Sequence, residues 1–226
     1  MIQTFQRFEK KYLLDPKQYQ FLLEKLQPYI EQDKFYLSSI RSIYYDTPRF
    51  ELIRRSIEKP KYKEKLRIRS YDEPKSDDEP VFVEFKKKFD GIVYKRRTKA
   101  AYKAVLEDID HCEFKDEQIG KEIRYALNYY KKLQPAIYIG CTRTSYTGKQ
   151  DKLLRITFDQ NIVYRVKDLC LKSSEKDKPV TDKIVMELKV GQAMPLWLVH
   201  ILNEAEAYPR GFSKVGTAFL KEIKGE

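Results

Sequence analysis

Hydrophobic and polar residues alternate with a period of two along several stretches of the chain, which predicts β-strands. The clearest stretch is Tyr62–Tyr71. Four cationic side chains share one of its faces: Lys63, Lys65, Arg67 and Arg69. Leu66 and Ile68 lie on the other face, together with Glu64 and Ser70. A single strand of this kind is typical of a sheet with one solvated face. A repeat of the pattern in other strands favours an anion-binding wall instead.

The alternation does recur along the chain. Strands are predicted over these further segments: Thr4–Leu14, Leu37–Tyr45, Val81–Lys88, Ile92–Thr98, Ala136–Tyr146, Leu153–Phe158, Ile162–Lys167 and Lys183–Val190. Phe89-Asp90-Gly91 joins two of them as a hairpin, because Asp-Gly between alternating runs suits a tight turn. Tyr44 and Tyr45 are interpreted as core aromatics.

Helical periodicity separates groups of these strands. Asp15-Pro16 supplies an N-cap followed by proline at the first helical position, and it opens a helix that reaches about Gln27. Further helices are predicted over these segments: Arg49–Ile57, two parts of Ala100–Leu133, and Pro195 to about Ala207. Hairpin connections favour an antiparallel sheet. We therefore predict the α+β class, with an antiparallel β-barrel of about eight strands and inserted and flanking helices. Residues 1–226 are predicted to form a single domain.

The net positive charge indicates anionic partners. The chain has 45 Lys and Arg against 34 Asp and Glu, a net charge of +11, which suits nucleic acid, a membrane surface or phosphate-rich small molecules. No nucleic-acid partner is expected, because the cations recur strand by strand and not in one exposed patch with aromatic residues. Three cysteines without a CxxC pair disfavour a zinc knuckle or a disulfide framework. The N-terminal residues lack the apolar region of a signal peptide, so we expect a cytoplasmic protein.

Cations and glutamates together form the candidate chemistry. Ten cations are predicted to line the barrel: Lys11, Arg67, Arg69, Lys86, Lys95, Arg97, Arg143, Arg155, Lys189 and Lys214. Two unit charges about 4 Å apart repel by about 4 kcal/mol at an effective dielectric of about 20, so such a lumen requires a polyvalent anion or interleaved carboxylates. An E-x-K pattern supplies carboxylates on the same faces at Glu9, Glu84 and Glu187. Carboxylates suit a hard divalent metal that bridges to phosphate oxygens, and arginine forks suit those oxygens directly. A linear triphosphate or polyphosphate with Mg²⁺ or Mn²⁺ satisfies both requirements, because it supplies the polyvalent anion for the cations and the divalent metal for the carboxylates.

The chain resembles the VTC (vacuolar transporter chaperone) polyphosphate polymerase domain in short stretches that occur in order: FEKKYLL, LRIRSY, VEFKKK, YKRR, CTRTSY, LRITFD, MELK and FSK. That domain belongs to the triphosphate tunnel metalloenzymes of the CYTH-like superfamily, whose fold is an antiparallel tunnel barrel. The resemblance implies catalytic roles for Arg67, Arg69, Lys86, Arg143, Arg155 and Lys189. It implies substrate binding by Lys11, Lys95, Arg97 and Lys214. Glu187 of MELK is the implied metal ligand, and Glu9 and Glu84 are either further metal ligands or charge-balancing partners.

The implied reaction transfers the γ-phosphoryl group of ATP to a growing polyphosphate chain. Two alternatives stay open: an inorganic or nucleoside triphosphatase of the same fold, and a non-catalytic polyphosphate-binding protein. The first strand reads Arg7-x-Glu9-x-Lys11, one acidic position short of the E-x-E-x-K of the hydrolases, which favours polymerisation or weak hydrolysis. The chain departs from the larger eukaryotic members in lacking a phosphate-sensing domain and membrane helices, which leaves open the coupling of synthesis to translocation. A membrane-protein partner is not visible in this chain and stays an open expectation.

Overall fold

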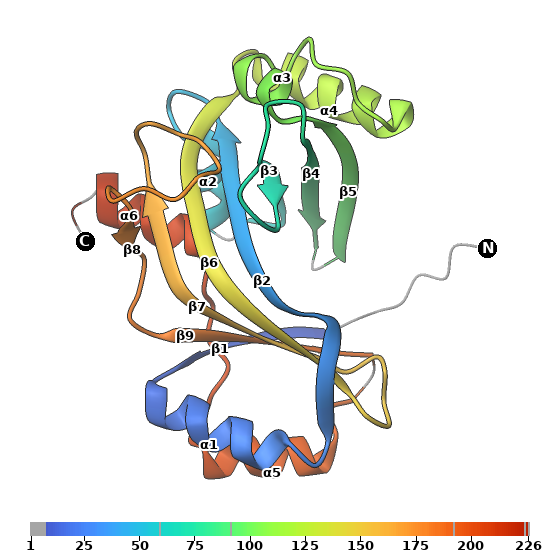
Figure 1. Cartoon of the computed structure of the whole chain (residues 1–226), viewed down its shortest axis with the longest axis vertical. Coiled ribbons are helices and arrows are strands. Elements are labelled where there is room, and N and C mark those ends of the chain that lie inside the picture. The colour runs from blue at the N-terminus through green and yellow to red at the C-terminus, as the bar shows by residue number, and fades with distance from the viewer. Residues whose placement is uncertain (1–7, 59, 91, 192, 224, 226) are drawn as a thin grey trace. The chain divides into compact units, whose positions relative to one another are not determined.

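The computed structural model describes residues 8–58, 60–90, 92–191, 193–223 and 225. In this part of the chain an antiparallel sheet is combined with helices, which confirms the predicted α+β class (Figure 1). The elements in chain order are β1 (Phe8–Leu14), α1 (Pro16–Leu26), β2 (Ile30–Asp46), α2 (Glu51–Ile57), β3 (Tyr62–Ser70), β4 (Pro80–Phe89), β5 (Ile92–Ala101), α3 (Tyr102–Glu107), α4 (Glu117–Tyr130), β6 (Gln134–Gly148), β7 (Arg155–Arg165), β8 (Lys178–Pro179), β9 (Ile184–Val190), α5 (Leu196–Glu204) and α6 (Lys214–Ile223). The strand order is β1-β9-β7-β6-β2-β3-β4-β5, and β8 pairs with β7.

The described residues fall into two compact units. The first unit comprises Met1–Ser38, Cys141–Ile162 and Thr181–Ser213. The second comprises Ser39–Gly140, Val163–Val180 and Lys214–Glu226. Strands β2, β6 and β7 contribute residues to both units. The single domain over residues 1–226 stays a prediction.

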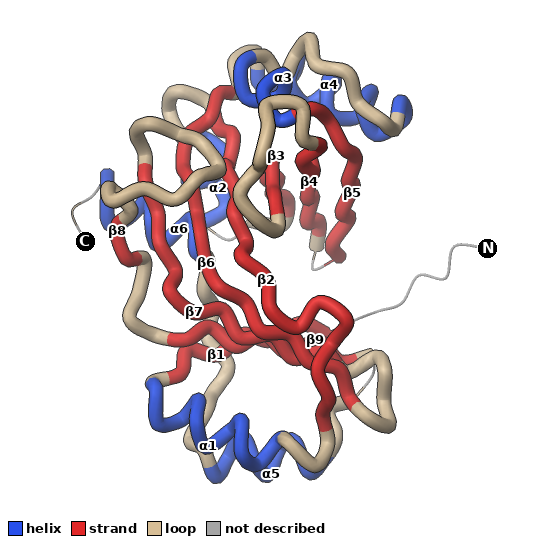
Figure 2. The backbone as a smooth tube through the Cα atoms, in the orientation of Figure 1, coloured by secondary structure: helices blue, strands red, loops and turns tan. Residues whose placement is uncertain are grey.

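The first unit packs α1 and α5 against the apolar face of its strands. The two helices lie side by side (Figure 2). Helix α1 begins as predicted: the Asp15 carboxylate accepts from the Gln18 amide at 2.8 Å, and the Asp15 amide donates to the Gln18 side chain at 3.1 Å. Its buried residues are Leu22 and Leu26, which join Leu188 of β9 in one core. Each such buried leucine stabilises the fold by about 1.5–3 kcal/mol.

The second unit has its own core between β3–β5 and helices α3 and α4. The apolar face of β3, with Leu66 and Ile68, is fully buried, and Ile123 and Leu127 of α4 pack in the same cluster. The residues that alternate with Leu66 and Ile68 along β3 are only half-buried. The alternation that predicted the two faces of Tyr62–Tyr71 is therefore confirmed.

Two strands differ from the predictions by more than a few residues. Strand β2 begins at Ile30 instead of Leu37. The segments Leu153–Phe158 and Ile162–Lys167 form one strand, β7. The polar residues between them favour turns, but Asn161 adopts a left-handed conformation (φ 49°) within the strand and the pairing continues. Thr4–Arg7 and Gly91, which belong to the predicted first strand and hairpin turn, lie outside the described residues.

The predicted closure into a barrel is wrong for the described part of the sheet. The pairing runs from β1 to β5 without a pair that joins these two end strands. Closure needs hydrogen bonds between two particular edges, whereas alternation specifies only which face each side chain occupies. The open edge strand β5 exposes all six of its first residues, Ile92–Arg97.

None of the described helices is long and apolar enough to cross a lipid bilayer.

Candidate functional site

The polar face of β3, β4 and β5 in the second unit forms what we call the cation wall. The name refers to six of the cationic side chains on that face: Lys65, Arg67, Arg69, Lys86, Lys95 and Arg97. In the strand register, Lys86 lies directly opposite both Lys65 and Lys95. Directly opposed residues of neighbouring strands point to the same face and lie about 5 Å apart, so these three like charges are neighbours.

Glu84 is a buried carboxylate on the same face as the cation wall, opposite Arg67 and Arg97. Its side chain is 1% exposed. Arg67 donates to Oε2 through Nε at 2.8 Å and through Nη2 at 2.6 Å, and Lys95 Nζ lies 2.6 Å from Oε1. Burial raises the pKa of Glu84, but Arg67, Arg69 and Lys95 outweigh it and lower that pKa to about 2. A metal ion at Glu84 would have to displace these cations, so the geometry favours the charge-balancing alternative.

Strand β2 extends the cation wall with two polar residues that the sequence interpretation missed. Tyr44 lies opposite Arg67, and Ser42 lies opposite Arg69. Arg67 Nη1 donates to Tyr44 Oη at 2.8 Å, and Arg69 Nε donates to Ser42 Oγ at 3.0 Å. Three nitrogens of Arg67 are therefore held in place by Tyr44 and Glu84. The period of two on β2 puts Ser42 and Tyr44 on one face, but only the pairing with β3 reveals which cations they meet.

The first unit carries a second group, the carboxylate–lysine cluster, on β1 and β9. Lys11 lies opposite Glu187, and Glu9 lies opposite Lys189. Lys11 Nζ is 3.9 Å from a carboxylate oxygen of each glutamate, and Lys189 Nζ is 2.8 Å from Glu187 Oε1. Burial raises the pKa of Glu187, but Lys189, Lys11 and Arg143 lower it to about 2. Glu187 therefore stays ionised at neutral pH, as a metal ligand must.

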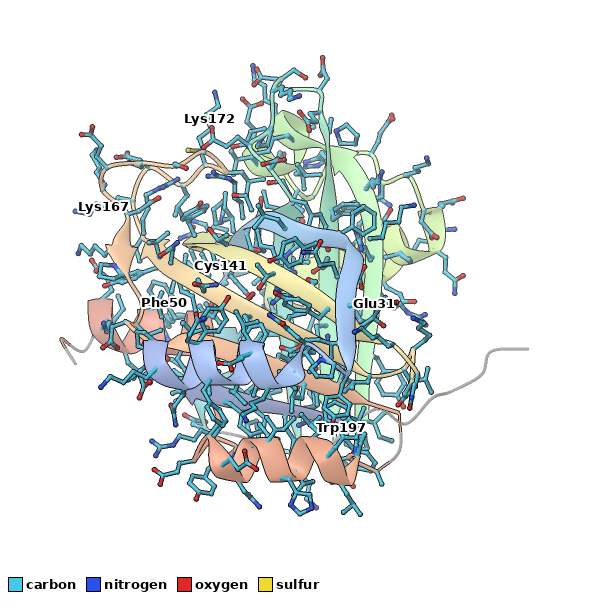
Figure 3. The ribbon with its side chains drawn as sticks, turned by 60° about the horizontal axis from the view of Figure 1, so that its bottom comes forward. Glu31, Phe50, Cys141, Lys167, Lys172 and Trp197 are labelled. Atoms are coloured by element: carbon cyan, nitrogen blue, oxygen red, sulfur yellow. The ribbon has the colours of Figure 1, made fainter. Side chains whose placement is uncertain are left out.

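Arg143 and Arg155 each have an acidic partner in the first unit. Arg143 lies on β6 two positions after Cys141, which is labelled in Figure 3. It binds Asp159 through two parallel hydrogen bonds, Nε to Oδ1 at 2.5 Å and Nη2 to Oδ2 at 2.7 Å. Asp159 is 1% exposed. Arg155 Nη2 lies 3.4 Å from Asp33 Oδ2 and is more exposed. The interpretation from sequence gave neither arginine a carboxylate partner.

All predicted site residues are described, and they form two groups. The second unit holds Arg67, Arg69, Lys86, Lys95, Arg97 and Glu84, together with Lys214. The first unit holds Lys11, Arg143, Arg155, Lys189, Glu9 and Glu187. Lys214 begins helix α6 and does not belong to a strand. The roles assigned to these residues stay predictions.

The carboxylate–lysine cluster has the donor set of a metal that shares its ligands with phosphate. No group of three or more His, Cys, Asp or Glu that could hold a metal is present among the described residues. Glu187 and Glu9 provide two carboxylates that approach the same lysine. Mg²⁺ is commonly bound by one or two carboxylates, with water and substrate phosphate completing its six ligands. The residues therefore fit a divalent ion that arrives with the phosphate, and not a preformed all-protein site.

Comparisons with known proteins bear on the fold and the family of the chain. None of the curated protein sequences matches the chain. A Bacillus halodurans protein described provisionally as an adenylate cyclase has a similar structure, with a TM-score of 0.56, 14% identity and coverage of 91% of this chain and 92% of that one. A protein of Pyrococcus horikoshii OT3 has a TM-score of 0.51 and 14% identity, over 96% of this chain and 100% of that one. These likenesses concern the fold alone. The profile of the VTC domain matches residues 6–221, nearly the whole chain, and the protein therefore belongs to the VTC domain family.

Proposed function

We propose that this protein is a metal-dependent polyphosphate polymerase that transfers the γ-phosphoryl group of ATP to the end of a polyphosphate chain. Membership of the VTC domain family supports a triphosphate- or polyphosphate-related enzyme of phosphoryl transfer. The observation that carries the proposal is the row of cations in the cation wall: Lys86 lies opposite both Lys65 and Lys95, with Arg67, Arg69 and Arg97 on the same face. A linear polyanion can contact such a row along its whole length.

The cation wall orients and stabilises the phosphates. Arg67 is held by Tyr44 and Glu84, so its guanidinium is fixed before substrate binds. Lys86 and Lys95 add point charges on the neighbouring strands. Phosphoryl transfer rests on positioning and on charge neutralisation, and preorganised cations lower its barrier without any nucleophilic side chain.

The carboxylate–lysine cluster prepares the metal site. Lys11 and Lys189 keep Glu187 ionised and restrict its orientation. Glu187, with Glu9, would hold Mg²⁺ or Mn²⁺. When held there, such an ion would supply positive charge for the phosphate groups of the substrate.

Glu84 and the two histidines are poorly suited to activate water, which favours a phosphate acceptor. Glu84 is a poor general base, because its pKa is about 2 and both oxygens have cationic partners. Of the two histidines, His111 is exposed and pairs with Asp108, and His200 is exposed on α5. A terminal phosphate oxygen of polyphosphate is already ionised and requires no base.

The experiment incubates purified protein with ATP and Mn²⁺ or Mg²⁺ and separates the products on a gel. We expect long-chain polyphosphate, and we expect Glu187→Gln and Arg67→Ala to abolish it. Lys121→Ala, on the exposed surface of α4, is the control that should retain activity. Release of free phosphate without polymer would indicate the hydrolase. Tight polyphosphate binding without ATP turnover would indicate the binding protein.

The cytoplasmic location, the membrane-protein partner and the lack of a nucleic-acid partner stay predictions.

A further inference from the structure

Tyr44 is the one tyrosine whose hydroxyl is bonded to a cation of the cation wall among the described hydrogen bonds. It is 9% exposed, and its Oη accepts the hydrogen bond from Arg67 Nη1 at 2.8 Å. The guanidinium carbon of Arg67 also lies 5.6 Å from the centre of the Tyr44 ring. Both contacts favour negative charge on the phenol, because the donor is itself a cation.

The charged groups around Tyr44 come from its own strand and from the strands beyond it: Asp46 from β2, Lys65, Arg67 and Arg69 from β3, Glu84 from β4, and Lys95 from β5. Both oxygens of Asp46 accept from backbone amides, those of Thr47, Leu52 and Ile53, so this carboxylate is turned to the start of α2. Residues 134–140 of β6, in the same unit, carry no charged side chain. Cations therefore dominate the field at the phenol.

The neighbouring tyrosine provides a contrast. Burial alone would raise the pKa of Tyr44, but Arg67, Arg69 and Lys65 lower it to about 7. Tyr45 points to the opposite face and donates to the Val105 carbonyl at 2.7 Å. Burial raises the pKa of Tyr45 far above its ordinary value. Two consecutive tyrosines therefore have opposite environments, and only one of them faces the cations.

We propose that Tyr44 is a proton-linked counterion of the cation wall: its phenol is ionised in the absence of ligand at mildly alkaline pH, and it takes up a proton when a polyphosphate binds. The inference rests on the proposed function, since it assumes that the wall binds a polyanion. A bound polyanion neutralises Lys65 and Arg69, so these cations no longer stabilise the phenolate. Arg67 keeps its hydrogen bond to Tyr44, but it then acts without Lys65 and Arg69 against the burial of the ring, and burial favours the neutral phenol.

The proton linkage gives the affinity a defined dependence on pH. Below the pKa of Tyr44, the phenol is already neutral and binding costs nothing extra. Above it, each site takes up one proton on binding, so the affinity falls about tenfold for each pH unit. With a pKa of about 7, the protein should bind about tenfold more weakly about one pH unit above that value than a variant without the phenol.

Tyrosinate absorbs in the near ultraviolet, so the titration can be followed directly. The free protein should show one tyrosine that titrates near pH 7, and inorganic tripolyphosphate should move this step to higher pH. Tyr44→Phe should lack the step, whereas Tyr45→Phe should retain it. Arg69→Gln should raise the pH of the step, because it removes one of the cations that stabilise the phenolate.

Binding of tripolyphosphate across the same pH range is the second readout. The ligand ionises too, but its own protons contribute equally to the wild type and to Tyr44→Phe, so the difference between their pH profiles reports Tyr44 alone. A wild-type protein with no tyrosine that titrates near neutrality, or a step that tripolyphosphate leaves in place, overturns the inference. Polymer synthesis without such a step refutes the role of Tyr44 and leaves the proposed function intact. A step that moves with tripolyphosphate, without polymer from ATP, refutes the polymerase and leaves Tyr44 as a group of a binding site.

Discussion

Glu84→Gln tests whether the buried carboxylate holds the cation wall together. The pKa of Glu84 lies at about 2 instead of 4.5. This difference of about 2.5, at about 1.36 kcal/mol for each pKa unit, corresponds to about 3 kcal/mol of stability. The amide also leaves Arg67 and Lys95 without a negative partner, and removing one member of a buried ion pair costs about 3–5 kcal/mol. We therefore expect the free energy of unfolding to fall by about 3 kcal/mol or more at neutral pH.

The pH dependence distinguishes this explanation from a simple packing defect. A carboxylate whose folded pKa is depressed stabilises the protein above its unfolded pKa, and that stabilisation is lost as the pH falls through the folded pKa. The difference between wild type and Glu84→Gln should therefore be largest near neutrality and shrink between pH 4.5 and about 2. Urea denaturation at several pH values measures it, with Glu117→Gln on the exposed surface of α4 as the control. A difference that is small, or that stays constant down to acid pH, would refute the reasoning.

Three further predictions concern single residues. Lys86→Gln removes a charge opposite both Lys65 and Lys95, so the affinity for tripolyphosphate should fall. An unchanged affinity in a binding assay would count against the proposed site. Asp159→Asn breaks the buried ion pair with Arg143, so the free energy of unfolding measured in urea should fall by about 3–5 kcal/mol. A variant as stable as the wild type would contradict that pairing. Asp15→Ala removes the N-cap of α1 and should cost about 1 kcal/mol, which calorimetry can measure; an unchanged melting temperature would show that the cap contributes nothing.

Sequence patterns predicted those features that depend on local geometry. The two faces of β3 follow from the alternation of Leu66 and Arg67, because side-chain direction in a strand depends only on the backbone. The N-cap at Asp15 is equally local. The same pattern could not distinguish Glu84 from Glu187, since each occurs in E-x-K. Glu84 is 1% exposed and Glu187 is 13% exposed, and this difference arises from neighbouring strands that no local pattern specifies.

The partners of the arginines could not be predicted from the sequence, for the same reason. Asp159 lies 16 residues from Arg143, on another strand, and no periodicity connects the two. Tyr44 lies 23 residues from Arg67 and meets it only because β2 pairs with β3 in one register. A slip of one residue would have turned Tyr44 to the other face. These contacts are properties of the assembled sheet.

The exposed edge strand β5 has a consequence for the behaviour of the protein in concentrated solution. An unpaired strand edge is a template on which a second chain can extend the sheet, and charged side chains protect such edges by repulsion. Here Lys95, Arg96 and Arg97 follow directly after the exposed apolar residues 92–94. The positive charges that we propose to bind an anion would also keep copies apart, so high salt or a bound polyanion should weaken this protection and promote aggregation through β5.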